Sequence, residues 1–122
     1  MEVKIEVRAD HLNATLIGPL SKEELFQAFE AAYEAAFNQG LRLILIDCSA
    51  LDGNLSTSDR FMLGKSGVAY WSSRSWKMLP KIAVVGEAPL IDGFGALVAS
   101  SGGVNARTFP STQEALNWLG IR

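Results

Sequence analysis

Three adjacent hydroxyl side chains, Ser56, Thr57 and Ser58, form the most suggestive chemical cluster in the sequence. They follow a polar, glycine-containing segment and precede a run with helical spacing, so we expect them at a helix N-terminus. A hydroxyl there can cap the helix by accepting a hydrogen bond from a backbone amide. It can also be phosphorylated, since the added charge interacts with the helix dipole and can switch a partner-binding surface. Ser56 and Thr57 are therefore candidates for both a capping role and a switch role.

Two carboxylates, Asp47 and Asp52, lie in the segment that leads to this hydroxyl cluster. As a pair they could bind a cation or act as a general acid and base. An aspartate at a strand end more commonly ties down the following loop by accepting hydrogen bonds from backbone amides. We therefore expect Asp47, Asp52 and Ser58 to anchor the loop or contact a partner, and we predict no metal site and no cofactor.

The other chemically reactive residues form no recognisable catalytic motif. His11 is the single histidine and is predicted to lie solvated in a turn, whereas the single cysteine, Cys48, is predicted to be buried. One cysteine excludes an internal disulfide and a cysteine metal cluster. The tripeptide GKS at 64–66 imitates the end of a phosphate-binding loop, but Asp59 occupies the position of that motif's first glycine. We therefore predict that the protein is not an enzyme.

The composition is that of a globular protein. The chain has 122 residues, 48% hydrophobic and 20% charged, which suits a single domain spanning 1–122 with a real core. The net charge is -2 and the basic residues are scattered, so no nucleic-acid binding is predicted. The N-terminal run EVKIEVRAD does not resemble a signal peptide, and no apolar run approaches the ~20 residues of a transmembrane segment. We expect a cytoplasmic domain of bacterial type.

The first third of the chain has the patterns of two strands and a helix. Apolar and charged residues alternate over 3–7 and an apolar run covers 12–17, so these segments predict a strand hairpin. A capping box that opens at Ser21 predicts a helix over 22–39, and the glycine after it favours a left-handed C-terminal cap.

The run 41–46 is almost wholly apolar and ends abruptly at Asp47. Its lack of alternation predicts a strand covered on both faces, at the buried centre of a parallel sheet. A second helix is predicted to begin near Ser56 or Ser58 and to end at about residue 73.

The last third of the chain predicts two further strands and two further helices. The strands cover 81–85 and 106–109, and the final helix opens with a capping box at Ser111. The helix between the strands is predicted to begin at Pro89. Its predicted buried stripe comprises Leu90, Ile91, Phe94, Leu97 and Val98.

Strand–helix–strand units join parallel neighbours by right-handed crossovers. The patterns therefore predict an α/β fold of order β-β-α-β-α-β-α-β-α. We expect a mixed, mostly parallel sheet of about five strands with four helices, in which the initial hairpin supplies one antiparallel edge.

Aromatic side chains of the second and third predicted helices and of the segment between them form another candidate surface. Aromatic residues are enriched at protein interfaces and in the walls of apolar pockets. The aromatic content and a mean hydropathy of +0.16 also lead us to expect a homodimer. The residues assigned to an apolar groove or interface are Phe61, Trp71, Trp76 and Phe94.

The order of elements resembles the STAS fold, the domain of anti-sigma-factor antagonists. More closely, the chain resembles the SpoIIAA-like family of small bacterial proteins. The resemblance covers nearly the whole chain. It is carried by the stretch LRLILIDCSALDGNLSTSDRFMLG, by KIAVVG followed by a helix, and by RTFPSTQEALNWL.

In the antagonist branch, a partner kinase phosphorylates a serine of an Asp-Ser-Ser-Gly-like motif, and this controls binding. The resemblance places Ser56 and Thr57 at the serines of that motif. Leu55 replaces its acidic residue and Ser58 its glycine, so the sequence departs from the pattern around the switch. The resemblance implies a non-enzymatic regulatory domain that presents the 47–60 loop and the following helix to a protein partner, such as a kinase-type regulator.

The broader family is also likened to CRAL-TRIO lipid-binding domains. This likeness implies an alternative function, the binding of a small apolar or lipid-like ligand. The aromatic residues of the candidate groove would then line the pocket, and the sequence leaves both functions open.

Overall fold

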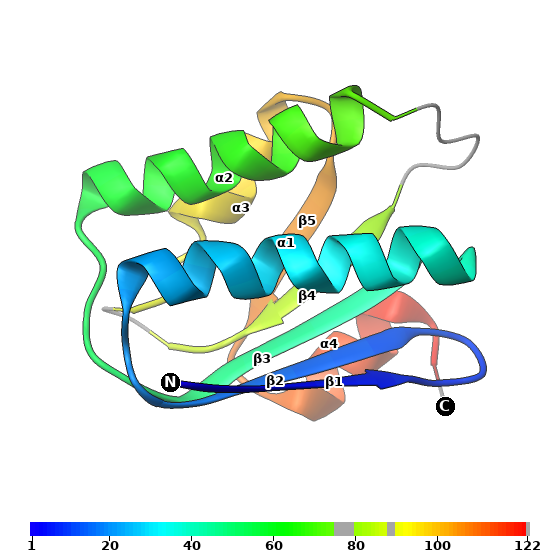
Figure 1. Ribbon diagram of the computed structural model, residues 1–122, viewed down its shortest axis with the longest axis horizontal. Helices are drawn as coiled ribbons and strands as arrows, with labels where there is room; N and C mark the ends of the chain where they lie inside the picture. Colours follow the sequence, from blue (N-terminus) through cyan, green and yellow to red (C-terminus); the bar gives the residue numbers. More distant parts are fainter. Residues whose placement is uncertain (75–79, 88–89, 122) are drawn as a thin grey trace.

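The computed structural model describes residues 1–74, 80–87 and 90–121 (Figure 1). Five strands form one sheet in the order β1-β2-β3-β4-β5, in which β1 and β2 are antiparallel and the other neighbours are parallel. The predicted fold class and element order are therefore confirmed. The strands are β1 (Glu2–Val7), β2 (Leu12–Pro19), β3 (Leu43–Asp52), β4 (Lys81–Val85) and β5 (Asn105–Phe109). The helices are α1 (Lys22–Gln39), α2 (Thr57–Ser72), α3 (Phe94–Ser101) and α4 (Thr112–Leu119).

The sheet separates two unequal helical layers (Figure 1). α1, α2 and α3 lie over one face, and α4 packs on the other face against β3, β4 and β5. Each right-handed crossover advances one strand in the same direction, and this places all three crossover helices on the same side. The larger apolar cluster lies under these three helices, and a smaller cluster lies under α4.

β3 lies at the centre of the sheet, as its apolar run predicts. Ile44 and Ile46 belong to the larger apolar cluster and Leu45 to the smaller one, and all three side chains are fully buried. Both faces of the strand are covered, which explains why its sequence shows no alternation.

Three helices begin at the predicted hydroxyl caps. The side chains of Ser21, Ser56 and Ser111 each accept a hydrogen bond from the amide three residues later, at 3.4, 3.0 and 3.3 Å. These contacts use amides that have no partner within the helix. Gly40 closes α1 in the left-handed conformation, with φ 68°.

The predicted end of the central strand at Asp47 is wrong, because β3 continues to Asp52. The pairing of β3 with β2 passes from Thr15 opposite Asp47 to Ile17 opposite Ala50. β3 therefore holds one extra residue at this point, a β-bulge, and the ladder resumes beyond it. The polar sequence after Asp47 belongs to a strand because β2 is long enough to pair with it.

The predicted start of the third helix at Pro89 is wrong as well, and Pro89 itself lies outside the described residues. α3 begins at Phe94, because Gly93 before it has a φ of 90°, which a right-handed helix does not contain. Leu97 was predicted to be buried and is 63% exposed. Two members of the predicted stripe are buried in the segment before the helix, namely Leu90 and Ile91.

His11 is buried rather than solvated, with 8% of its surface exposed. The amide of Arg8 donates to the carbonyl oxygen of His11 at 2.9 Å, so His11 ends the hairpin ladder while Ala9 and Asp10 form the tip. Nδ1 of His11 lies 2.8 Å from Oδ1 of Asp10. This hydrogen bond lowers the pKa of the Asp10 carboxyl.

α2 and α3 approach each other closely at Gly64. A Cβ atom on Gly64 would lie 2.4 Å from the carbonyl oxygen of Gly95 and 2.9 Å from Cβ of Val98. The backbone of α3 fills the space that a side chain would need, so the close contact of these helices depends on this glycine.

Gly64→Ala should lower the free energy of unfolding by about 1–3 kcal/mol, because the new methyl group overlaps backbone atoms of α3. Gly67→Ala is the matched control on the same helix, where the nearest atom is the hydroxyl oxygen of Tyr33 at 3.3 Å. Alanine is favoured over glycine in a helix by about 1 kcal/mol, so the control should be close to wild type or more stable. Urea denaturation measures both, and equal stability of the two variants would contradict the close packing.

Candidate functional site

The hydroxyl cluster lies exposed at the N-terminus of α2. Ser56 is the cap residue, and its Oγ accepts from the amide of Asp59 at 3.0 Å. Thr57 Oγ1 accepts from Nη2 of Arg60 at 3.3 Å, and Ser58 is exposed in the first turn. The predicted capping role of Ser56 is confirmed, and the switch role remains a prediction.

Arg60 links the hydroxyl cluster to the start of α3. Its Nη1 donates to the carbonyl oxygen of Leu55 at 2.9 Å, and its Nε lies 3.4 Å from Oδ1 of Asp92. The same Asp92 oxygen accepts from the amide of Phe94, the first residue of α3, at 3.0 Å. One guanidinium therefore holds the segments that precede both helices, and only 15% of its side chain is exposed.

The sequence patterns did not identify Arg60 and Asp92. The sequence did contain one indication that Arg60 has a special role. It is a cation in the first turn of a helix, where the positive end of the helix dipole is unfavourable for it. Such a cation needs an anionic or carbonyl partner, and Asp92 with the Leu55 carbonyl supplies both. Asp92 lies 32 positions after Arg60 in the chain, so the partner became visible only in the folded structure.

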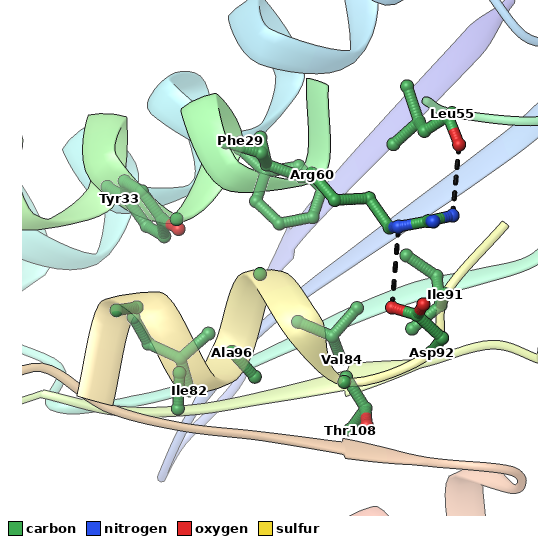
Figure 2. A pocket seen from close by; sticks show the side chains of 16 residues that line it. Phe29, Tyr33, Leu55, Arg60, Ile82, Val84, Ile91, Asp92, Ala96 and Thr108 are labelled. Carbon is green, nitrogen blue, oxygen red and sulfur yellow. Dashed lines mark hydrogen bonds and ion pairs between the residues drawn. The ribbon is translucent and has the colours of Figure 1, made fainter. Parts of the chain in front are cut away.

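A narrow apolar cavity of about 50 Å³ lies behind Arg60 (Figure 2). Arg60 extends across its rim between Leu55 and Asp92. A water molecule occupies about 30 Å³ in the liquid, and pockets for small ligands measure about 300–1,000 Å³. The cavity as it stands is therefore too small for a lipid-like ligand. Its wall includes Phe29 and Tyr33 from α1, Ile82 and Val84 from β4, and Ala96 from α3.

The structure does not bring the predicted aromatic groove together. Trp71 is 5% exposed and packs in the core, with its ring centroid 5.6 Å from that of Tyr33. Phe61 and Phe94 lie side by side between α2 and α3, with centroids 6.5 Å apart, and neither lines the cavity. Trp76 lies outside the described residues.

Large apolar side chains are exposed directly after the hydroxyl cluster. Phe61 is 42% exposed and Met62 is 52% exposed, both in the first turns of α2. Phe61 also borders a shallow groove between α2 and α3, to which the exposed Leu97 contributes. We call the residues Ser56–Ser58, Phe61 and Met62 the presentation surface.

The two candidate carboxylates, Asp47 and Asp52, do not form a shared site in the structure. Oδ1 of Asp47 accepts from the amide of Ser49 at 3.0 Å and from its hydroxyl at 2.6 Å, so this carboxylate holds the β-bulge. Asp52 is exposed, and its backbone carbonyl accepts from the amide of Leu20 at 2.8 Å. Over the described ranges, no three residues among His, Cys, Asp and Glu are placed to hold a metal ion.

Cys48 is buried at the same bulge, with 1% exposure, as predicted. Burial raises the pKa of its thiol from 9.0 to about 12, and the negative charge of Asp47 adds to the shift. The thiol is therefore protonated at neutral pH and is not a nucleophile.

None of the helices in the described part of the chain is long and apolar enough to cross a membrane.

Solved structures of anti-sigma factor antagonists share this fold. An anti-sigma factor antagonist from Mycobacterium paratuberculosis aligns with a TM-score of 0.62 at 16% identity, over 98% of this chain and 93% of that one. The anti-sigma factor antagonist SpoIIAA in its unphosphorylated form aligns with a TM-score of 0.56 at 15% identity, over 98% of both chains. No protein-family model and no curated protein matches the sequence. The predicted STAS fold is therefore confirmed, at identities that establish the fold alone.

Ser56→Ala should lower the free energy of unfolding by about 1 kcal/mol, because the amide of Asp59 loses its capping acceptor. Ser58→Ala is the matched control, since Ser58 is an exposed serine inside the first turn and does not cap the helix. Thermal denaturation followed by circular dichroism compares the two variants. A loss of stability for Ser58→Ala as large as that for Ser56→Ala would contradict the capping role.

The Cys48 thiol should not react with a soluble disulfide reagent until the protein unfolds, because it is buried and protonated. Stability should also fall as pH rises from about 9 toward 12. The unfolded state loses its thiol proton near pH 9.0 whereas the folded state retains it to about 12. Urea titrations at several pH values check this slope, which should be smaller in Cys48→Ala. Rapid thiol reaction in the native state would contradict the burial.

Proposed function

We propose that this protein is a non-enzymatic regulatory domain that presents the 47–60 segment and α2 to a protein partner. The observation that supports the proposal is the presentation surface itself. Three exposed hydroxyls stand directly before the exposed side chains of Phe61 and Met62 on one helix. Aromatic residues and methionine are enriched at the centres of protein interfaces, where polar groups form the rim.

The fold adds a second line of support. The two solved structures described above are anti-sigma factor antagonists, and they align over nearly the whole of this chain. We take the partner to be a protein with an apolar pocket for Phe61 or Met62 and hydrogen-bonding groups for the hydroxyls. A kinase-type regulator has the chemistry to bind this surface and to modify it.

Phosphorylation of Ser56 or Thr57 would act through neighbours that the structure places close by. A phosphate on Ser56 would sit at the positive end of the α2 dipole, but beside the Asp59 carboxylate in the first turn. A phosphate on Thr57 would lie next to Arg60, whose Nη2 already donates to Thr57 Oγ1. It would compete with Asp92 for this guanidinium and so alter the contact that holds the start of α3.

Binding of an apolar or lipid-like ligand is the alternative, and it has less support. The cavity behind Arg60 holds about 50 Å³ and would need α2 and α3 to separate before it could admit such a ligand. That separation would break the close helix contact at Gly64.

Affinity purification from the source cell, with mass spectrometry of co-purifying proteins, should identify a partner whose binding depends on the presentation surface. Phe61→Ser and Met62→Ser should each weaken that binding by about tenfold or more in calorimetric titration, since truncated interface anchors cost about 2 kcal/mol. Ile17→Ser is the matched control, because Ile17 is 40% exposed and lies on β2, a strand that does not contact α2. The Ile17→Ser variant should bind the partner with the same affinity as the wild-type protein.

The switch is tested on the same partner. Ser56→Asp and Thr57→Asp should weaken binding more than Thr57→Ala does, because Thr57→Ala removes one hydroxyl contact whereas the aspartates also introduce charge. If the partner bound all of these variants and both apolar variants as tightly as wild type, the proposed surface would be wrong.

A further inference from the structure

The edge strand β1 exposes an apolar stripe. β1 is the first strand of the sheet and pairs only with β2, so its other edge is free among the described residues. Val3, Ile5 and Val7 are 39%, 36% and 53% exposed. They alternate with charged residues, and β1 contains neither proline nor a break in its register with β2. The strand therefore lacks two devices, proline and bulges, that commonly block pairing at a sheet edge.

The backbone N–H and C=O groups of the stripe residues point away from β2, toward the free edge of the sheet. The amide of Arg8 donates to the carbonyl oxygen of His11, so Arg8 and His11 face each other as a hydrogen-bonded pair. Hydrogen-bonded and non-hydrogen-bonded pairs alternate along an antiparallel ladder. The even-numbered residues of β1 therefore bond to β2, and Val3, Ile5 and Val7 direct their N–H and C=O groups to the free edge.

The two faces of β1 differ in character. Val3, Ile5 and Val7 pair with Leu16, Ala14 and Leu12 of β2, which belong to the apolar cluster under α1, so the stripe lies on the α1 face. The charged residues lie on the opposite face. There Glu2, Lys4 and Glu6 pair with the uncharged residues Ile17, Thr15 and Asn13.

We propose that two copies of this chain pair through their β1 strands in antiparallel orientation, with Ile5 on the two-fold axis. Ile5 then faces Ile5 of the second copy and Val3 faces Val7, and these are the residues with outward-pointing backbone groups. On the other face, Lys4 lies opposite Glu6 and Glu2 lies opposite Arg8 of the second copy. The two five-stranded sheets become one continuous sheet.

Charge selects this register over its neighbours. A register shifted by one step in one direction places Lys4 opposite Lys4 and Glu2 opposite Glu6. A shift in the other direction places Glu6 opposite Glu6 and Lys4 opposite Arg8. Like charges directly opposite each other destabilise a strand pair. The registers centred on Val3 and on Val7 also pair opposite charges, Glu2 with Lys4 and Glu6 with Arg8, but each leaves part of β1 without a partner strand. The register centred on Ile5 pairs opposite charges from Glu2 to Arg8, so the sequence of β1 is complementary to itself over its full length.

The pairing has a consequence for the assembly. A two-fold axis that relates edge strands in one sheet runs perpendicular to that sheet, so the helical layers of both copies lie on the same side. Two presentation surfaces would then face the same side of the dimer. The homodimer that the composition led us to expect thereby acquires a defined interface, independent of the proposed function.

Charge reversal tests the interface. Lys4→Glu alone and Glu6→Lys alone should each weaken dimerisation about tenfold or more, because two symmetry-related pairs change from attraction to repulsion. The double variant Lys4→Glu/Glu6→Lys should dimerise to within about threefold of wild type, because opposite charges face each other again. Sedimentation at tens of micromolar measures all four proteins. A monomeric wild type, or a double variant no better than the singles, would overturn the proposal.

Cysteine cross-linking tests the register. Ile5→Cys should form an intermolecular disulfide under mild oxidation, because its Cα atom would lie about 5.5 Å from the same atom of the second copy. Val3→Cys is the matched control and should remain uncross-linked, since it faces Val7 of the second copy. Native Cys48 is buried and does not interfere. Equal cross-linking of both variants, or cross-linking of Val3→Cys alone, would contradict the register centred on Ile5.

Discussion

The right-handed crossover in a uniformly advancing parallel sheet is the constraint on which the rest of this structure depends. The sheet order follows the chain order, so all three crossovers carry their helices to the same face. α2 is consequently packed between α1 and α3, with its N-terminus close to the end of β3. Among the described residues, α4 is the helix that covers the opposite face, over β3 to β5, and β1 lies at a free edge of the sheet.

This arrangement places the features of functional interest on the surface. The interior near the candidate site is closed by the close approach of α2 and α3 at Gly64 and by the Arg60 guanidinium across the cavity rim. Phe61 lies toward α3 and Met62 lies toward α1, and neither side chain is covered by the neighbouring helix. A domain with a tight interior and exposed apolar side chains beside a helix cap is suited to binding another protein.

The residues that first suggested chemistry have structural reasons to be where they are. Asp47 accepts from the amide of Ser49 at the bulge in β3, and the raised pKa of the Cys48 thiol follows from its burial at the same place. Arg60 is the opposite case, because the sequence did not suggest it and the structure gives it a place beside the candidate switch. It stabilises two helix starts, and it is also the group through which a charge on Thr57 would reach α3.

The sequence by itself determined the elements whose signals are local. The caps at Ser21 and Ser111, the span of α1 and the buried strand through Ile46 agree with the structure, since each depends on residues a few positions apart. The order of these elements sufficed to identify the STAS fold, which the similar structures confirm.

Only the tertiary structure decided the features that depend on distant segments. β3 extends past Asp47 because β2 pairs with it, and Leu97 is exposed because α3 begins only after Gly93. The contact of Arg60 with Asp92 joins residues far apart in the chain, and no local pattern encodes their approach. The candidate switch residues Ser56 and Thr57 were visible in the sequence. The contacts that connect Thr57 through Arg60 and Asp92 to the start of α3 required the fold.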